Sequence, residues 1–358
     1  MLETPVAYNM STWPNFLPRW GRLPVEQYLI RNWNHTSPEQ TSDQRSRLIH
    51  EYIHLDAIPK EWDPTDFGEA WYEPDANDTD AAFAPSRIPT EAEIETILHP
   101  WRSHDLRKKA WEIWCDKGRG YPVILRTYYG NRKEGDRKFR EYMQVSDVLD
   151  ARADVYALND AELFNFGSSD WRGVFEILPE IAGCKRYQSD YDASDINNIF
   201  EIAPLAYHLR WPDREMLDID FVDLAEEIEN GKAEHPDWKD DPDVLLEAGD
   251  TTIRSLLRTV TLSWIIIVDE TTFKTDELLI VYFDMHQSVT VEGRLELDPG
   301  YIDEILMRWE DGGRPLGIAM ENGTVGEKYR LSNEEGRRFF RLSEDLEYKW
   351  DDTKPFRQ

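Results

Sequence analysis

The stretch LSWIIIVDETTFKTDELLIVYF, residues 262–283, contains two apolar runs on either side of a short polar segment. The runs Leu262 to Val268 and Leu278 to Phe283 are rich in β-branched and aromatic side chains, which favour strands. Residues Glu270 to Glu277 connect them. This pattern predicts a β-hairpin, and the alternating residues Val289 to Leu297 predict a third strand.

A helix is expected after these strands. Pro299 suits the first turn of a helix, because the N–H group that proline lacks has no partner there. Apolar residues then share one face at helical spacing: Ile302, Ile305, Leu306 and Trp309. Strands followed by a helix are typical of a small α+β domain.

The chain before residue 167 predicts mostly helices. Thr90 and Glu93 form the capping-box pattern that opens a helix. Residues Val123 to Tyr129 predict a short strand or buried segment. Helices are expected over residues 25–33, 42–57, 90–99, 103–115 and 137–166, the last of them broken near residue 145.

Charge is distributed unevenly along the chain. The sequence holds 41 basic and 71 acidic residues, for a net charge of −30. Residues 1–167 contribute 20 basic and 28 acidic residues, whereas residues 168–358 contribute 21 and 43. This shift predicts two separately folded domains, 1–167 and 168–358. The negative field repels phosphates and anionic lipids, so neither nucleic acid nor a membrane is an expected partner.

No targeting signal is readable in the sequence. The first twenty residues lack the charged and apolar segments of a signal peptide, and the longest apolar stretch is too short to cross a bilayer. A cytoplasmic location is therefore the default expectation. Cys115 and Cys184 allow at most one disulfide, which excludes a disulfide scaffold. The oligomeric state stays open.

One short motif carries recognisable chemistry. Residues His50 to His54 read H-E-Y-I-H, which matches H-E-x-x-H. On a helix, positions i and i+4 share a face, so both imidazoles can bind one zinc ion. Glu51 can then act as the general base that takes a proton from a metal-bound water. An ordinary amphipathic helix with two surface histidines has the same spacing, and that alternative stays open.

The run RLIHEYIHLD, residues 47–56, resembles the active-site helix of the aspzincins, which are fungal deuterolysin-like and lysine-specific zinc metalloendopeptidases. Two later segments follow in the order of that family. LRTYYG, residues 125–130, resembles its D-x-x-Y-G segment, and DARADVYAL, residues 150–158, resembles its N-A-D-x-Y-A segment. The resemblance covers residues 45–166, less than half of the chain.

The family's third zinc ligand is not matched. That ligand is an Asp three residues before the Tyr of the Y-G pair, and this position is Arg126. A guanidinium has no lone pair to give to zinc, and its charge opposes the cation. A substitute ligand is sought in the acidic segment 59–90, where the candidates are Asp63, Asp66, Glu69 and Asp75.

Together these observations predict an α+β protein. The resemblance implies a mostly helical zincin-like metallopeptidase region over 1–167, followed by an acidic α+β domain of unknown role. The leading function is zinc-dependent hydrolysis of peptide or protein substrates, with His50 and His54 as ligands and Glu51 as the catalytic base. The alternative is a catalytically inactive zincin-like protein whose acidic C-terminal domain engages a basic protein partner. Arg126 favours this alternative.

Overall fold

The apolar runs of residues 262–283 form two paired strands, as the sequence predicts. Strands β5 (Ser263–Val268) and β6 (Glu277–Phe283) are antiparallel, with Ile265 opposite Val281. The helix α13 (Glu270–Thr275) lies between them. Asp269 is its N-cap, and the Asp269 carboxylate accepts a hydrogen bond from the Thr272 backbone N–H at 2.8 Å. The third predicted strand is also confirmed, because β7 (Val289–Glu296) pairs antiparallel with β6.

The computed structural model describes residues 20–55, 57–59, 62, 87–116, 122–130, 132–144, 146, 149–150, 153–167, 170–182, 186–187, 221–248, 252–284, 286–296, 302, 304–305 and 323–347. The acidic candidates Asp63, Asp66, Glu69 and Asp75 lie outside these residues, as do Cys184 and most of the helix expected after Pro299.

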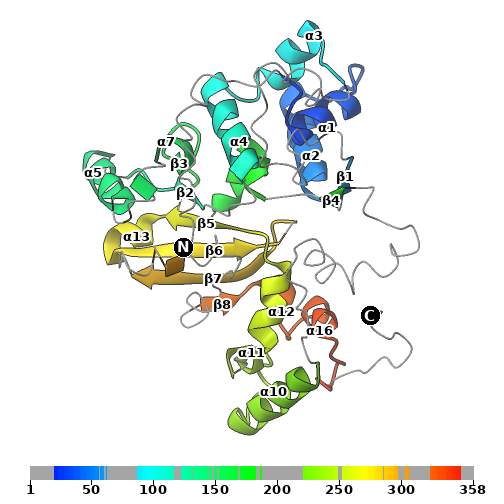
Figure 1. Ribbon diagram of the computed structural model, residues 1–358, viewed down its shortest axis with the longest axis vertical. Coiled ribbons are helices and arrows are strands. Elements are labelled where there is room, and N and C mark those ends of the chain that lie inside the picture. Colours follow the sequence, from blue (N-terminus) through cyan, green and yellow to red (C-terminus); the bar gives the residue numbers. More distant parts are fainter. Residues whose placement is uncertain are drawn as a thin grey trace, which may run out of the picture.

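One mixed sheet organises this part of the chain (Figure 1). Its strand order is β3-β2-β5-β6-β7-β8, where β2 is Val123–Arg126, β3 is Ala157–Leu158 and β8 is Gly323–Val325. Strand β2 runs parallel to β3 and β5, and the remaining pairs are antiparallel. A separate pair of short parallel strands joins β1 (Ala57–Ile58) to β4 (Arg186–Tyr187). Helices and a mixed sheet together make this an α+β protein.

The charge boundary near residue 167 does not separate two folded units. Strands β2 and β3 precede it, yet they belong to the same sheet as β5 to β8, with Val123 opposite Ile265. Both hydrophobic clusters of the protein also contain buried residues from before and after the boundary. The expectation that 1–167 and 168–358 fold separately is therefore wrong. Charge composition describes mostly the surface of a protein, whereas three of the four residue pairs that join β2 to β5 across this boundary are between buried apolar residues.

Side chains alternate along the central strands and divide between the two clusters. Ile265 and Ile267 pack with residues of α1 (Pro24–Asn32), α2 (Thr41–Ile53), α4 (His104–Asp116) and α8 (Val174–Ile177). Trp264, Ile266 and Val268 face the other way and pack with residues of α5 (Arg132–Met143), α10 (Phe221–Glu234), α11 (Val244–Ala248) and α12 (Thr252–Val260). Helices therefore cover both faces of the sheet.

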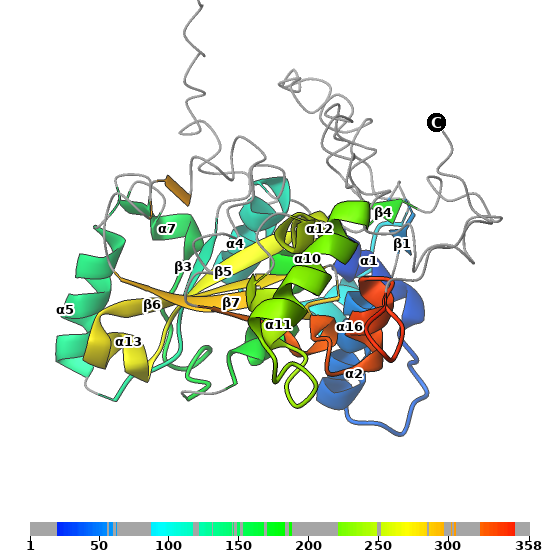
Figure 2. The same cartoon turned by 90° about the horizontal axis from the view of Figure 1, so that it is seen from below.

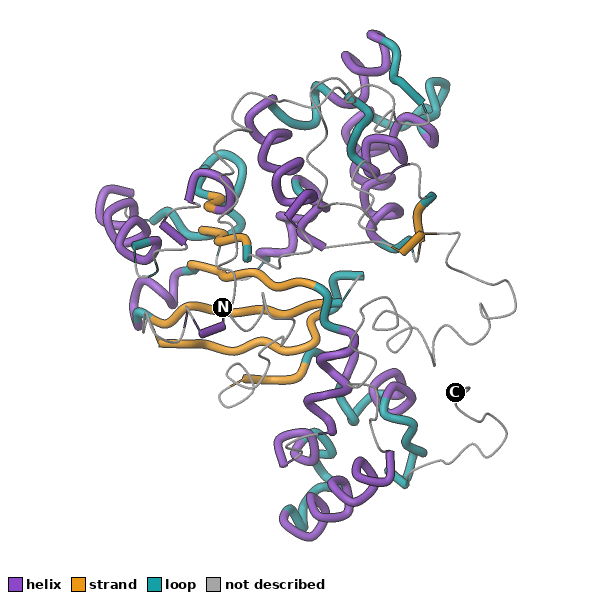
Figure 3. The backbone as a smooth tube through the Cα atoms, viewed as in Figure 1, coloured by secondary structure: helices purple, strands orange, loops and turns teal. Residues whose placement is uncertain are grey.

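The tube in Figure 3 shows the strands between two groups of helices. The other helical elements are α3 (Glu91–Glu93), η3 (Ile94–Leu98), α7 (Ala153–Tyr156), η4 (Trp171–Gly173), η5 (Pro179–Ala182), η9 (Glu327–Tyr329) and α16 (Glu334–Phe339). No helix in the described ranges is long and apolar enough to span a membrane.

Different helices lie at the two ends of the central strands. Helices α5 and α13 lie at one end, and α12 lies at the other (Figures 1 and 2). Strand β5 begins after α12 and ends at α13, whereas the antiparallel β6 ends near the start of β5, with Phe283 opposite Ser263. The turn from β6 to β7 therefore lies at the α12 end of the sheet.

Candidate functional site

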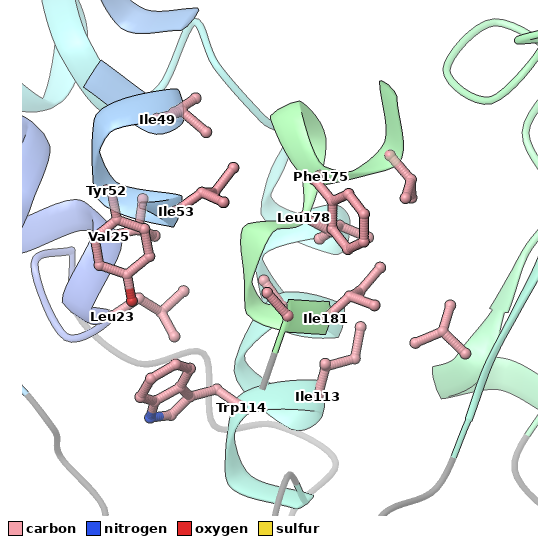
Figure 4. Packing of buried hydrophobic residues seen from close by; sticks show 14 of the residues in the cluster. Leu23, Val25, Ile49, Tyr52, Ile53, Ile113, Trp114, Phe175, Leu178 and Ile181 are labelled. Carbon is pink, nitrogen blue, oxygen red and sulfur yellow. The ribbon is translucent and has the colours of Figure 1, made fainter. Parts of the chain in front are cut away.

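His50 and Glu51 of the H-E-x-x-H motif lie on the outer side of α2, and His54 caps its C-terminal end. The inner side of α2 buries Leu48, Ile49, Tyr52 and Ile53. Figure 4 shows Ile49 and Ile53 pointing toward Phe175 and Leu178, with Tyr52 beside Val25 and Leu23. This inward stripe leaves His50 and His54 exposed. The expected helix is confirmed, but it ends at Ile53, and its histidines lie on the surface of the protein.

The two histidines nevertheless stay together at the C-terminal end of α2. Their ring centroids are 4.3 Å apart, at an interplanar angle of 52°. His54 Nδ1 lies 2.8 Å from the carbonyl oxygen of His50. Donation from Nδ1 to that carbonyl leaves Nε2 as the basic nitrogen of His54. A histidine held by such a bond is oriented as metal-ligating histidines usually are.

Glu51 is already bound by two donors. Arg47 Nη1 donates to Glu51 Oε1 at 2.6 Å, and the hydroxyl of Tyr28 donates to Oε2 at 3.3 Å. Burial, together with the neighbouring Glu51 carboxylate, raises the pKa of Tyr28, which keeps its hydroxyl protonated as a donor. The Glu51 side chain is 42% exposed, so it does not line a dry active-site cleft. These contacts hold its carboxylate in an ion pair on the helix surface.

A third histidine lies beside His54, and no pattern in the sequence singles it out. His286 is in the turn between β6 and β7, and its ring is parallel to that of His54, with an interplanar angle of 5° and centroids 6.4 Å apart. The buried carboxylate of Asp284 shapes the turn by accepting hydrogen bonds from the backbone N–H groups of His286 and Ser288, at 2.8 and 2.9 Å. No local motif surrounds His286, so only the fold reveals this neighbour.

Arg126 lies at the opposite end of the sheet from these histidines. It ends β2 and is opposite Val268, the last residue of β5, whereas His286 follows β6 at the other end. A strand of six residues spans about 20 Å. Arg126 donates hydrogen bonds to Asp136, to Asn159 and to the carbonyl of Tyr128, and its guanidinium lies over the Tyr129 ring. The position of the aspzincin third ligand therefore does not meet His50 and His54 in this fold.

Zinc fits this site only in part. Two imidazoles at adjacent turns, one with a fixed Nδ1, provide a suitable donor chemistry. Within the described ranges, however, no group of three or more His, Cys, Asp or Glu side chains is already arranged to hold a metal ion. The structure thus brings the two predicted ligands together and leaves the remainder of the coordination to a side-chain movement or to another ligand.

Comparisons with known proteins add no assignment. No protein-family model matches the chain, and neither a curated protein nor a solved structure does.

Proposed function

We propose that this chain is a zinc-binding protein that engages a protein partner and does not cleave peptides. Zinc binds at the C-terminal end of α2 through His50 and His54. The partner is basic, because the chain is strongly acidic. This is the non-catalytic alternative derived from the sequence, and it now has a specific observation in its favour.

That observation is the state of Glu51. A catalytic base must be placed to accept a proton from a metal-bound water. The Glu51 carboxylate is instead paired with Arg47 and bonded to Tyr28, on an exposed face of α2. Both donors occupy the carboxylate oxygens and compete with a water for them. Within the H-E-x-x-H motif, the two histidines therefore support metal binding more than the glutamate supports catalysis.

The acidic partner surface lies far from α2 in the chain. It consists of exposed carboxylates on α10 and the turn that follows: Glu226, Glu229, Glu234, Asp237, Asp240 and Asp241. Lys232 bonds to Glu229 and to the carbonyl of Leu346, so it supports the local structure. We refer to these six carboxylates as the α10 surface. A field of this kind attracts a basic partner and weakens with added salt.

The test measures zinc content and the cleavage of a protein substrate on the same purified full-length chain. Elemental mass spectrometry should find zinc after reconstitution and dialysis, and His50→Ala and His54→Ala should reduce it. Incubation of the zinc-loaded chain with an unfolded protein substrate should give no cleavage above that of Glu51→Gln. His35→Ala is the control, because His35 is exposed on the loop before α2 and away from the pair in sequence.

Peptide hydrolysis remains a second candidate because the H-E-x-x-H spacing lies on a real helix. It predicts the opposite result in one measurement. Cleavage that depends on zinc and disappears in Glu51→Gln, with zinc content unchanged, would replace the binding proposal by the peptidase interpretation. Zinc content and cleavage are measured independently, so the experiment shows whether Glu51 acts as a catalytic base regardless of how much zinc is bound.

A further inference from the structure

The geometry points to His286 as a third zinc ligand, supplied by the turn between β6 and β7. This inference rests on the proposed zinc binding by His50 and His54 and names the residue that completes their site. It also gives the site a role in the fold, because the metal would link α2 to the central sheet.

The two ring spacings that involve His54 bracket the spacing expected for a shared ion. Two imidazoles on one tetrahedral zinc, with Zn–N bonds of about 2.0–2.1 Å, have centroids about 5 Å apart. The centroid distance is 4.3 Å from His54 to His50 and 6.4 Å from His54 to His286. His54 thus lies between a ring that is slightly too near and one that is slightly too far. We expect side-chain rotation to close these differences when zinc binds. His50 and His54 are exposed, and exposed side chains rotate within nanoseconds.

The backbone holds His286 more firmly than an ordinary loop would. Asp284 accepts its N–H and that of Ser288, and the other carboxylate oxygen accepts from Lys328 Nζ and the Tyr329 hydroxyl, each at 2.7 Å. Asp284 is 4% exposed. A turn fixed in this way presents His286 at a constant position opposite α2, which is the preorganisation that a metal ligand needs.

The local electrostatics also favour a cation. The last carbonyl groups of α2 carry the negative end of the helix dipole, and His54 is the residue that caps this end. The carboxylates of Glu51 and Asp284 lie on the two elements that carry the histidines. The Glu51 carboxylate is paired with Arg47 and that of Asp284 with Lys328. The negative end of the α2 dipole is therefore the main charge that favours zinc at this position.

Zinc titration of full-length variants tests the inference. Competition with a chromogenic chelator measures zinc affinity, and thermal unfolding with and without zinc gives a second readout. His286→Phe keeps an aromatic ring against His54 but removes the nitrogen ligand, so it separates coordination from packing. Removing a ligand should weaken zinc affinity by about tenfold or more. His286→Phe should also lose the zinc-dependent rise in melting temperature, while its metal-free melting temperature stays near that of the parent chain.

Each outcome decides between the two proposals. His35→Ala should bind zinc as the parent chain does. If His50→Ala and His54→Ala lose zinc but His286→Phe and His286→Ala bind it with unchanged affinity, His286 is not a ligand and the two-histidine proposal stands. If the parent chain binds no zinc, both proposals fail together. A visible Co²⁺ spectrum that is identical in the parent chain and His286→Phe would also overturn the inference.

Discussion

The guanidinium of Arg102 donates to both carboxylate oxygens of Glu180, at 2.9 and 2.8 Å, with neither side chain more than 1% exposed. A second buried pair lies alongside, where Arg107 Nε donates to Glu26 Oε1 at 2.5 Å. The two pairs approach within 3.9 Å, from Arg102 Nη2 to Glu26 Oε1. They connect α1, α4 and η5 through charges that have no access to water.

Glu180→Gln should destabilise the protein strongly. Without the Glu180 charge, the buried Arg102 and Arg107 share the single carboxylate of Glu26. Breaking a buried ion pair in this way costs about 3–5 kcal/mol. Urea unfolding followed by circular dichroism measures the loss. Glu141→Gln is the matched control, because Glu141 pairs with Arg137 on an exposed face of α5, and exposed pairs contribute little. Equal effects of the two substitutions would contradict this account of the buried network.

Asp269 makes the stability of the sheet depend on pH. Burial alone raises the pKa of this carboxyl, but hydrogen bonds from Arg294 and from the Thr272 N–H outweigh burial and hold the pKa below its usual range. Arg294 Nη2 lies 2.5 Å from Asp269 Oδ2, and Thr272 N lies 2.8 Å from Oδ1. Since the folded-state pKa is lowered, the stabilisation is present above the unfolded pKa of about 3.9 and is lost as the pH falls below it.

Asp269→Asn should therefore cost stability at neutral pH and very little in acid. Asparagine keeps the helix cap of α13 but loses the charge that Arg294 requires. The expected cost at pH 7 is about 1.5–3 kcal/mol, the range for hydrogen bonds to a charged group. Unfolding free energies at pH 7, 5, 4 and 3 should show the difference from the parent chain shrinking below pH 4. A constant difference would show that Asp269 acts only through packing.

The strands of the second half were predictable because their signals are local. Residues 262–283 alternate between two buried faces and are interrupted by a segment that caps its own helix at Asp269. The parallel pairing of β2 with β5 was not predictable, since the sequence has no local mark of which distant strand lies beside β2. The same limit explains why a charge boundary was mistaken for a domain boundary.

The candidate site was predictable to the same degree. His50 and His54 are four residues apart on one helix, so their proximity follows from helical geometry. Their exposure was not expected, although Leu48, Ile49, Tyr52 and Ile53 already form the stripe that faces the core. His286 depends on the tertiary position of the β6–β7 turn, and its neighbours in sequence contain no metal-binding spacing.

The α10 surface should bind a basic partner through charge. Replacing Glu226 and Glu229 by Lys changes the local charge by four units on exposed positions of α10, with little expected change in folding. Binding of a lysine-rich peptide, measured by fluorescence anisotropy, should weaken in this variant and weaken for the parent chain as salt is raised. If neither the charge-reversing variant nor added salt weakens peptide binding, the α10 surface is not the site of a basic partner.

The substitution Arg126→Asp tests whether Arg126 occupies the zinc-ligand position that the aspzincin resemblance implies. If Arg126 occupied the family's ligand position beside His50 and His54, the substitution would raise zinc affinity. In the structure, Arg126 is fully buried at the other end of the sheet, where it pairs with Asp136 at 2.6 Å and packs on the ring of Tyr129. A carboxylate there would face Asp136 without its counter-charge. We therefore expect a loss of stability of about 3–5 kcal/mol and no gain in zinc affinity.

Arg126→Met removes the charge and keeps much of the volume, so it should destabilise less than Arg126→Asp. Chelator competition and urea unfolding on both variants measure the two quantities, and tighter zinc binding by a folded Arg126→Asp chain would restore the alignment.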